Sequence, residues 1–182
     1  MEKGKVLHSS NCFPMNGIFE NSRGLRDLAK HARIADFIRH HRLDFVGISE
    51  TGKSDFSVSL VNRLSSGVDF TWKSRSPRGR FRGILLGVRT ENMDVLASSK
   101  GEFHIKFHIR NKADNFIWSL VAMYGATQDE HKSALLRELV NLVKKNPCPI
   151  ISIYLGSHMR RIEAGLTTDG LSYLTMALTV LI

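Results

Sequence analysis

The segment Leu43–Thr51, which reads LDFVGISET, decides how this sequence is interpreted. Its apolar part, Leu43–Ile48, predicts a buried strand that runs straight into the carboxylate of Glu50. A carboxylate at the carboxyl end of a strand is well placed to bind a hard cation such as Mg²⁺. On position alone, a carboxylate in a surface loop remains the alternative interpretation of Glu50.

Helices and strands are predicted on both sides of this segment. The expected elements are a strand at Asn16–Phe19, a helix at Leu25–His41, a helix at Phe56–Leu64 capped by Ser54 or Asp55, strands at Phe70–Lys73, Gly83–Val88, Met93–Ala97, Glu102–Ile109 and Phe116–Tyr124, a helix from Asp129 to Lys145, and a strand at Pro149–Tyr154. Helices and strands alternate at both ends, and a block of strands lies between them. This order indicates an α/β architecture with antiparallel hairpins in the middle.

Two amphipathic patterns predict which side chains are buried. Alternation along Glu102–Arg110 predicts a half-buried antiparallel strand, with His104 and His108 facing solvent. The inward side chains of this strand are expected to be Phe103, Ile105, Phe107 and Ile109. In the helix that begins at Asp129, the expected apolar stripe comprises Leu135, Leu136, Leu139, Val140 and Val143. A hairpin turn is predicted at Asn111–Asn115.

Charge and cysteine content narrow the class of protein. The 182 residues suffice for one domain with a core, and the formal net charge of +9 favours nucleic acid as a partner. A solvated basic face without a ligand is the alternative. Cys12 and Cys148 are far apart and show no metal-ligand spacing. The N-terminus is too polar for a signal peptide and no apolar run could cross a membrane, so we expect an intracellular protein, with the nucleus as a fitting location.

Three further features could contact phosphate. Asn21 follows the first predicted strand, where its amide could hold a phosphate or a water, although a turn-forming Asn is the alternative. Tyr124 ends a strand, and its phenol could donate to a phosphate oxygen, although a sheet-edge position also explains it. A basic segment offers guanidinium donors that match phosphate geometry, although a solvated loop is the alternative. Its arginines are Arg75, Arg78, Arg80 and Arg82.

Taken in order, four segments resemble the endonuclease/exonuclease/phosphatase (DNase I-like) family. Asn21–Leu25 (NSRGL) resembles the family's W-N-x-R-G-L opening, and Leu43–Thr51 resembles its strand that ends in E-T. Gly79–Val88 (GRFRGILLGV) and Val121–Lys132 (VAMYGATQDEHK) are similar to segments of the endonuclease domains of plant LINE-type retrotransposons. The resemblance covers residues from about Met15 to Ile150.

The resemblance implies a four-layered α/β sandwich that cleaves phosphodiester bonds with the help of Mg²⁺. By motif match, Glu50 would be the metal ligand, Asn21 would organise the metal or the nucleophile, and Tyr124 would steady the scissile phosphate. The arginines of Arg75–Arg82 would contact DNA, with RNA as an alternative. Neither a membrane nor an obligate protein partner is inferred. The same fold also leaves open a phosphatase for phosphorylated lipids or sugars.

Departures from the family indicate a partial domain without activity. After a strand like Pro147–Ile150 the family has G-G-D-F-N, whose Asp and Asn belong to the catalytic centre, whereas this chain continues ISIYLG. The later S-D-H motif, whose His is central to the family's mechanism, is absent. Glu20 stands where the family has Trp, and Phe81–Arg82 replaces a Ser-Gly pair. We therefore expect a truncated, inactive domain whose C-terminal part is missing.

The tail, residues 151–182, is predicted to be translated in a shifted reading frame. One possible nucleotide sequence that encodes Ile151–Gly156 can be read with one extra guanine in front of it. In that reading frame it encodes D-F-N-I-L-R, which contains the expected motif. Leu166–Met176, regrouped in the same frame, reads N-D-R-W-P-F-L-F-N-N, which is similar to the same retrotransposon elements. A divergent C-terminus is the alternative.

The predicted organisation is thus an irregular N-terminus at 1–15, a truncated domain at 16–150 and a frameshifted tail. We expect an inactive remnant of a retrotransposon endonuclease. The alternative is a fragment that retains only non-specific binding to nucleic acid.

Overall fold

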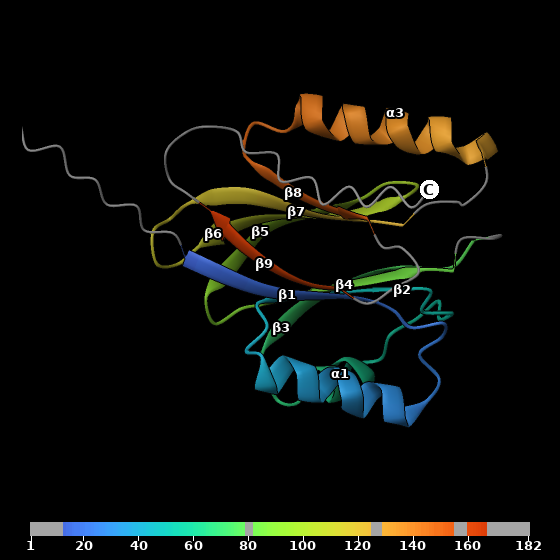
Figure 1. The fold of residues 1–182 in the computed structure, drawn as a ribbon, viewed down its shortest axis with the longest axis vertical. Coiled ribbons are helices and arrows are strands. Elements are labelled where there is room, and N and C mark those ends of the chain that lie inside the picture. Colours follow the sequence, from blue (N-terminus) through green and yellow to red (C-terminus); the bar gives the residue numbers. More distant parts are fainter. Residues whose placement is uncertain (1–12, 79–81, 125–128, 155–159, 167–182) are drawn as a thin grey trace, which may run out of the picture.

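The structure has four layers, in the order helix, sheet, sheet, helices (Figure 1). It is a computed structural model, and it describes residues 13–78, 82–124, 129–154 and 160–166. One helix covers the outer face of one sheet, and two helices cover the outer face of the other. The α/β sandwich expected from the sequence is therefore confirmed. Within the described ranges, no helix is long and apolar enough to cross a membrane.

The first sheet has five strands in the order β3-β4-β2-β1-β9. This sheet and its two covering helices consist of β1 (Phe13–Asn21), α1 (Leu28–His40), β2 (Phe45–Ser49), α2 (Val58–Ser65), β3 (Phe70–Arg75), β4 (Ile84–Arg89) and β9 (Arg160–Leu166). β1 and β2 are parallel and are connected by α1, whereas the other neighbouring strands are antiparallel. The carboxyl ends of β1 and β2 therefore meet at the same edge.

The second sheet has four strands in the order β5-β6-β7-β8. Its strands and its helix are β5 (Met93–Lys100), β6 (His104–Asn111), β7 (Ile117–Met123), α3 (Asp129–Lys145) and β8 (Ile150–Tyr154). α3 connects β7 to the parallel strand β8. The predicted turn at Asn111–Asn115 joins β6 to β7, and Asn115 takes the left-handed conformation, with φ of +58°.

The main core lies between the two sheets. It gathers Phe45 of β2 and Ile84 of β4 with Phe107 of β6 and Trp118 of β7, all of which are almost completely buried. A second cluster, which includes Ile38 of α1, fills the space between the first sheet and its two helices. The predicted inward face of β6 is confirmed, because Phe103, Ile105, Phe107 and Ile109 are all buried.

The boundaries of β1 and α2 differ from the sequence predictions. β1 begins at Phe13 and so includes part of the segment expected to be irregular. Ser57 is the N-cap of α2 in place of Ser54 or Asp55, and its Oγ accepts the N–H of Leu60 at 3.3 Å. The prediction for this cap is wrong because the Asp55 carboxylate instead accepts the N–H of the next residue.

The helix α3 covers the face of β6 that the alternating sequence pattern predicted to be exposed to solvent. His104 is buried because α3 packs over this face and brings Glu138 into contact with the imidazole. The predicted stripe of α3 is wrong in part as well. The side chains that pack on the sheet are Leu135, Leu139 and Leu142. The exposed apolar side chains of the helix are Leu136, Val140 and Val143.

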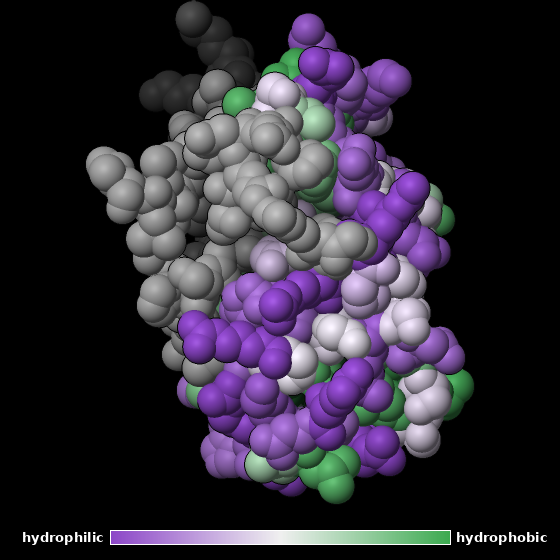
Figure 2. Space-filling model, turned by 90° about the vertical axis from the view of Figure 1, so that its right-hand side faces the viewer, coloured by the Kyte–Doolittle hydropathy of each residue, from purple (hydrophilic) through white to green (hydrophobic). Residues whose placement is uncertain are grey.

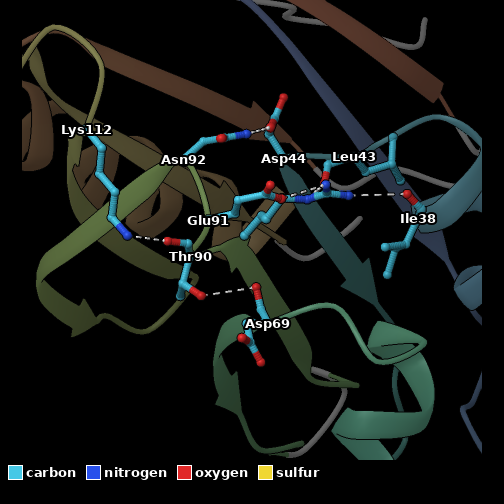
Figure 3. Close-up of polar contacts among 9 residues, drawn as sticks. Ile38, Leu43, Asp44, Asp69, Thr90, Glu91, Asn92 and Lys112 are labelled. Carbon is cyan, nitrogen blue, oxygen red and sulfur yellow. Dashed lines mark hydrogen bonds and ion pairs between the residues drawn. The ribbon is translucent and has the colours of Figure 1, made fainter.

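Arg89, at the end of β4, ties the first sheet to α1 through the carbonyls of Leu43 and Ile38. Figure 3 shows these two residues together with Asp44 and Asn92. The Arg89 guanidinium is buried; Nε donates to the carbonyl of Leu43 at 2.9 Å, and Nη2 donates to that of Ile38 at 3.5 Å. Beside it, the buried carboxylate of Asp44 accepts a hydrogen bond of 3.3 Å from Nδ2 of Asn92. This network lies at the amino end of β2, opposite the edge where the carboxyl ends of β1 and β2 meet.

The described part of the segment 151–182 comprises β8 from Ile151 onward and all of β9. β8 continues to Tyr154 beside β7, and β9 pairs antiparallel with β1. The pairings show where Ile151–Tyr154 and Arg160–Leu166 lie in the sheets. The origin of this segment in a shifted reading frame stays a prediction.

Candidate functional site

Asn21, Glu50 and Tyr124 meet at one edge of the sandwich, although they are far apart in the sequence. The side-chain amide of Asn21 donates to Glu50 Oε1 at 2.7 Å. The phenol of Tyr124 donates to the same oxygen at 3.1 Å. The structure thus gathers, into what we call the Glu50 cluster, the three residues to which sequence analysis gave a metal-binding or catalytic role. Their chemical roles stay predictions.

Parallel pairing explains why Asn21 lies beside Glu50. In the register of β1 and β2, Asn21 pairs with Ser49, so the residue that follows β2 is next to the last residue of β1. Glu50 itself has a φ of +52°, in the left-handed region that non-glycine residues rarely adopt. This turn ends the strand and directs the carboxylate toward the space between the sheets, where Tyr124 lies.

The loop after Asn21 is held firmly against the end of β2. The N–H of Gly24 donates to the carbonyl of Glu50 at 2.7 Å, and the Ser22 hydroxyl donates to that of Ser49 at 3.0 Å. From α1, Lys30 Nζ donates to the carbonyl of Ser22 at 2.6 Å. Sequence analysis did not identify Lys30, whose signal is only a basic residue in the first turn of a helix.

Tyr124 reaches the cluster from the second sheet. It follows β7, and its N–H donates to the carbonyl of Phe103 at 2.9 Å. Its ring packs against the core between the sheets. Since Asn21 and Glu50 belong to the first sheet, the cluster bridges both sheets, and its geometry depends on how they pack.

Below the cluster, two hydroxyl groups are fully buried without a hydrogen-bond partner in the described part of the chain. They are Ser49 Oγ and Thr51 Oγ1. Thr51 packs against Gly83, where an added Cβ would lie 2.7 Å from Thr51 Oγ1. Gly83 also has a φ of +91°, so only glycine fits this position without strain.

Glu20, which replaces the Trp of the family pattern, is buried beside this loop and forms an ion pair with Arg33 of α1. A buried carboxylate is costly unless it is paired. Arg33 supplies that pair, so the departure at Glu20 is accommodated within the fold.

One end of the basic segment, at Arg82, lies next to the Glu50 cluster. Arg82 accepts the N–H of Gly52 through its carbonyl at 2.9 Å, two residues beyond Glu50, and its side chain is exposed. Arg78 is exposed as well, and Arg80 lies outside the described residues. Arg75 instead donates to the carbonyls of Gly101 and Glu102, and burial lowers its pKa. Arg75 therefore connects the two sheets.

Hydrophilic side chains cover most of the described surface seen from the right-hand side of Figure 1 (Figure 2). The carboxyl ends of β1, β2 and β7 point toward this side of the molecule. The Glu50 cluster thus lies at a polar end of the sandwich.

The cluster suits a cation that needs few protein ligands. Glu50 Oε2 has no partner among the described residues, and Mg²⁺ typically takes one or two carboxylates together with waters and phosphate oxygens. No group of three or more His, Cys, Asp or Glu side chains in the described ranges could hold a metal ion. The residues present therefore fit a site with one carboxylate.

Searches with protein-family models and among curated proteins found no match. Solved structures do match. An endonuclease/exonuclease/phosphatase family protein from Bacteroides thetaiotaomicron has a TM-score of 0.60 and 14% identity, over 79% of this chain and 63% of that one. The human Nocturnin catalytic domain with a bound sulfate anion has a TM-score of 0.57 and 14% identity, over 78% and 63%.

A third match is TDP2 from D. rerio complexed with a single-strand DNA product. Its TM-score is 0.54 and its identity 17%, over 78% of this chain and 59% of that one. These likenesses show that the chain has the DNase I-like fold. The chain spans less than two thirds of the length of each of these three structures.

Proposed function

We propose that this chain is the amino-terminal part of an endonuclease domain of the plant LINE retrotransposon kind, and that its Glu50 cluster binds a divalent cation and a phosphate without cleaving DNA. One observation supports this most strongly. Asn21 and Tyr124, from different sheets, both donate to a single oxygen of Glu50, which leaves the other oxygen for a cation.

The roles of the three side chains are inferred from their contacts. Glu50 would hold the cation, and a bound Mg²⁺ would polarise a phosphoryl oxygen and activate a water molecule. Asn21 orients the carboxylate of Glu50 through its amide N–H. Tyr124 carries a phenolic donor at the same point, which could turn to a phosphate oxygen placed between the sheets.

The proposed lack of cleavage rests on the residues that come directly after β8. Tyr154 is the register partner of Met123, so the chain leaves β8 beside Tyr124. The sequence that follows β8 is Leu155-Gly156-Ser157-His158, which has no carboxylate where the family has D-F-N. A second carboxylate would complete the metal ligands that phosphodiester hydrolysis uses, and this stretch does not supply one.

Sensitised terbium luminescence tests the cation site. Tb³⁺ is an oxygen-seeking cation, and Tyr124 lies close enough to Glu50 to transfer excitation energy to it. We expect Tb³⁺ emission that Mg²⁺ displaces. Glu50→Gln should abolish it, whereas Glu91→Gln, at an exposed carboxylate near the opposite edge, should leave it unchanged. Equal emission from wild type and Glu50→Gln would refute the site.

A supercoiled plasmid tests the activity. We expect the wild-type chain to nick it no faster than Glu50→Gln in Mg²⁺. Nicking by the wild type that the variant loses would show an active endonuclease. Hydrolysis of a phosphorylated sugar that depends on Glu50 would instead favour a phosphatase, the class to which a mannosyl-6-phosphatase of the same fold belongs.

We also propose that the chain retains binding to nucleic acid with little sequence preference. The net charge of +9 and the exposed side chains of Arg78 and Arg82 support this, as does the single-strand DNA in the TDP2 complex. Affinity for an oligonucleotide should fall steeply with salt, since each phosphate contact releases counterions and added salt opposes that release. Binding that does not change with salt would contradict this proposal.

A further inference from the structure

A groove runs between α3 and β6 on the outer face of the second sheet. It has a volume of about 480 Å³. Lys106 of β6 lines one wall, and Arg137 and Lys145 of α3 line the other. Pockets of roughly 300–1,000 Å³ typically hold ligands the size of small organic molecules. A few linked nucleotides of one strand fit such a volume, whereas a duplex does not.

The carboxylates of the groove do not balance its three basic side chains. Glu138 is already engaged, because it contacts His104 and accepts the N–H groups of Glu102 and Phe103 at 3.0 Å each. Burial alone would raise the pKa of Glu138, but the hydrogen bonds from His104 and from the backbone outweigh burial and lower it. The other lining carboxylate, on Glu102, belongs to an exposed residue.

Two of the three basic side chains follow one another along α3, and the third faces them from β6. Arg137 and Lys145 are eight residues apart on α3, a separation of about 12 Å along the helix axis. Successive phosphates of one stacked strand are about 3.4 Å apart along their axis, so the two side chains would contact different phosphates. Across the groove, Lys106 is held in place by a hydrogen bond to Asn146 Oδ1 of 2.7 Å.

The groove starts close to the Glu50 cluster. Phe103, between the lining residues Glu102 and His104, accepts the N–H of Tyr124. Arg75, the first arginine of the basic segment, donates to the carbonyl of Gly101 at the same end. A strand that passes the Glu50 cluster would therefore meet the groove directly.

We propose that the groove between α3 and β6 binds the sugar–phosphate backbone of a single nucleic-acid strand as it leaves the Glu50 cluster. This inference rests on the proposed binding of nucleic acid, and it names the form of the ligand and a surface for it. It assigns phosphate contacts to Lys106, Arg137 and Lys145, none of which belongs to the basic segment Arg75–Arg82.

The test compares two double variants that each remove two positive charges. Arg137→Gln/Lys145→Gln changes the groove. Arg39→Gln/Arg63→Gln changes exposed side chains on α1 and α2, which cover the other sheet. Binding of a fluorescent single-stranded oligonucleotide is measured by anisotropy over a range of salt concentrations. Circular dichroism checks that both variants are folded.

We expect the groove variant to bind more weakly and to lower the slope of log affinity against log salt by about 1.4, since each phosphate contact on a single strand contributes about 0.7. The control variant should keep the wild-type slope. Equal changes in both variants would overturn the proposal, because they would reflect net charge alone. An equal effect on duplex binding would overturn the assignment to a single strand. Tighter binding of a polyglutamate peptide that the groove variant loses would identify an acidic protein instead.

A measurement on the unmodified chain removes the dependence on folded variants. Amide hydrogen exchange with and without the oligonucleotide should show protection at residues 102–106 and 137–145. Exchange that is unchanged there, with oligonucleotide bound, would overturn the proposal. Terbium emission reports on the Glu50 cluster separately, and the groove variant should retain the wild-type emission, because neither Arg137 nor Lys145 belongs to that cluster. Loss of the cation site and loss of the groove are thus distinguishable.

Discussion

Replacing Arg89 by Met should destabilise the fold more than any exposed arginine would. The guanidinium is buried, and its hydrogen bond to the carbonyl of Leu43 is 2.9 Å long. The variant leaves that buried carbonyl without its charged donor, which costs about 1.5–3 kcal/mol. The carbonyl of Ile38 loses little, because its bond to Arg89 is 3.5 Å long and the N–H of Leu43 also donates to it, at 3.1 Å. Glu91 is too exposed to add much.

The assay is urea unfolding followed by tryptophan fluorescence, because the side chain of Trp118 is fully buried between the sheets and becomes exposed on unfolding. With a slope of about 2 kcal/mol per M urea, a loss of about 2.5 kcal/mol lowers the midpoint by ~1.2 M. Arg39→Met provides the control, because Arg39 is exposed and forms an ion pair with Asp36 within its own helix. The control should change stability by less than about 0.5 kcal/mol. A midpoint of Arg89→Met equal to that of Arg39→Met would refute the reasoning.

Three further predictions concern α3 and the base of the Glu50 cluster. The pKa of Glu138 lies below its ordinary value of 4.5, so the stability that its ionised carboxylate contributes is present above that pH and is lost as the pH falls below it. The free energy of unfolding of Glu138→Gln should therefore depend less on pH in this acid range than that of the wild type. Leu139→Ala should cost about 2 kcal/mol in urea unfolding and Leu136→Ala less than about 0.5 kcal/mol, because only Leu139 packs on the sheet; equal costs would contradict the packing. Gly83→Ala should cost about 1–3 kcal/mol of stability, because its φ is positive and the added Cβ would meet Thr51. It should also weaken Tb³⁺ binding, and an unchanged affinity would show that the loop at Gly83 does not support the Glu50 cluster.

The fold was accessible from the sequence because strong local patterns agreed with the motif order. Leu43–Ile48 reads as a buried strand, and the structure buries β2 on both faces. The alternation of Phe103, Ile105, Phe107 and Ile109 also matched the buried face of β6. Such patterns depend on neighbours within one element, so they survive into the folded state.

The errors arose where a second element covers the first. Alternation separates the two faces of β6 but does not reveal that α3 lies over one of them, so His104 was expected in solvent. The apolar residues of α3 cover a wide arc, and the sequence alone does not say how the helix is rotated on the sheet. In the structure, Leu142 packs on the sheet and Leu136 is exposed, which the sequence pattern did not distinguish.

The geometry of the candidate site was only partly accessible. Motif order identified Asn21, Glu50 and Tyr124 individually, but their meeting depends on the parallel register of β1 with β2 and on the stacking of the two sheets. The left-handed conformation of Glu50 has no signal in its residue type, because a glutamate rarely adopts it. The supporting contact of Lys30 with the carbonyl of Ser22 is likewise visible only in three dimensions.

Cation binding and cleavage should be separable in this chain. The three residues of the Glu50 cluster all precede residue 125, and their described contacts are made with residues of the first 124. Among the described residues, the side-chain hydrogen bonds of Glu50 thus come from Asn21 and Tyr124, and we expect a change after β8 to leave these two bonds in place. We predict that a chain carrying D-F-N in place of Leu155–Ser157, directly after β8, binds Tb³⁺ more tightly, because a second carboxylate is added. Plasmid nicking in Mg²⁺ measures whether this carboxylate is also enough for cleavage. Tighter binding without nicking would show that residues beyond this motif are needed as well, whereas unchanged binding would refute the placement of the motif beside Tyr124.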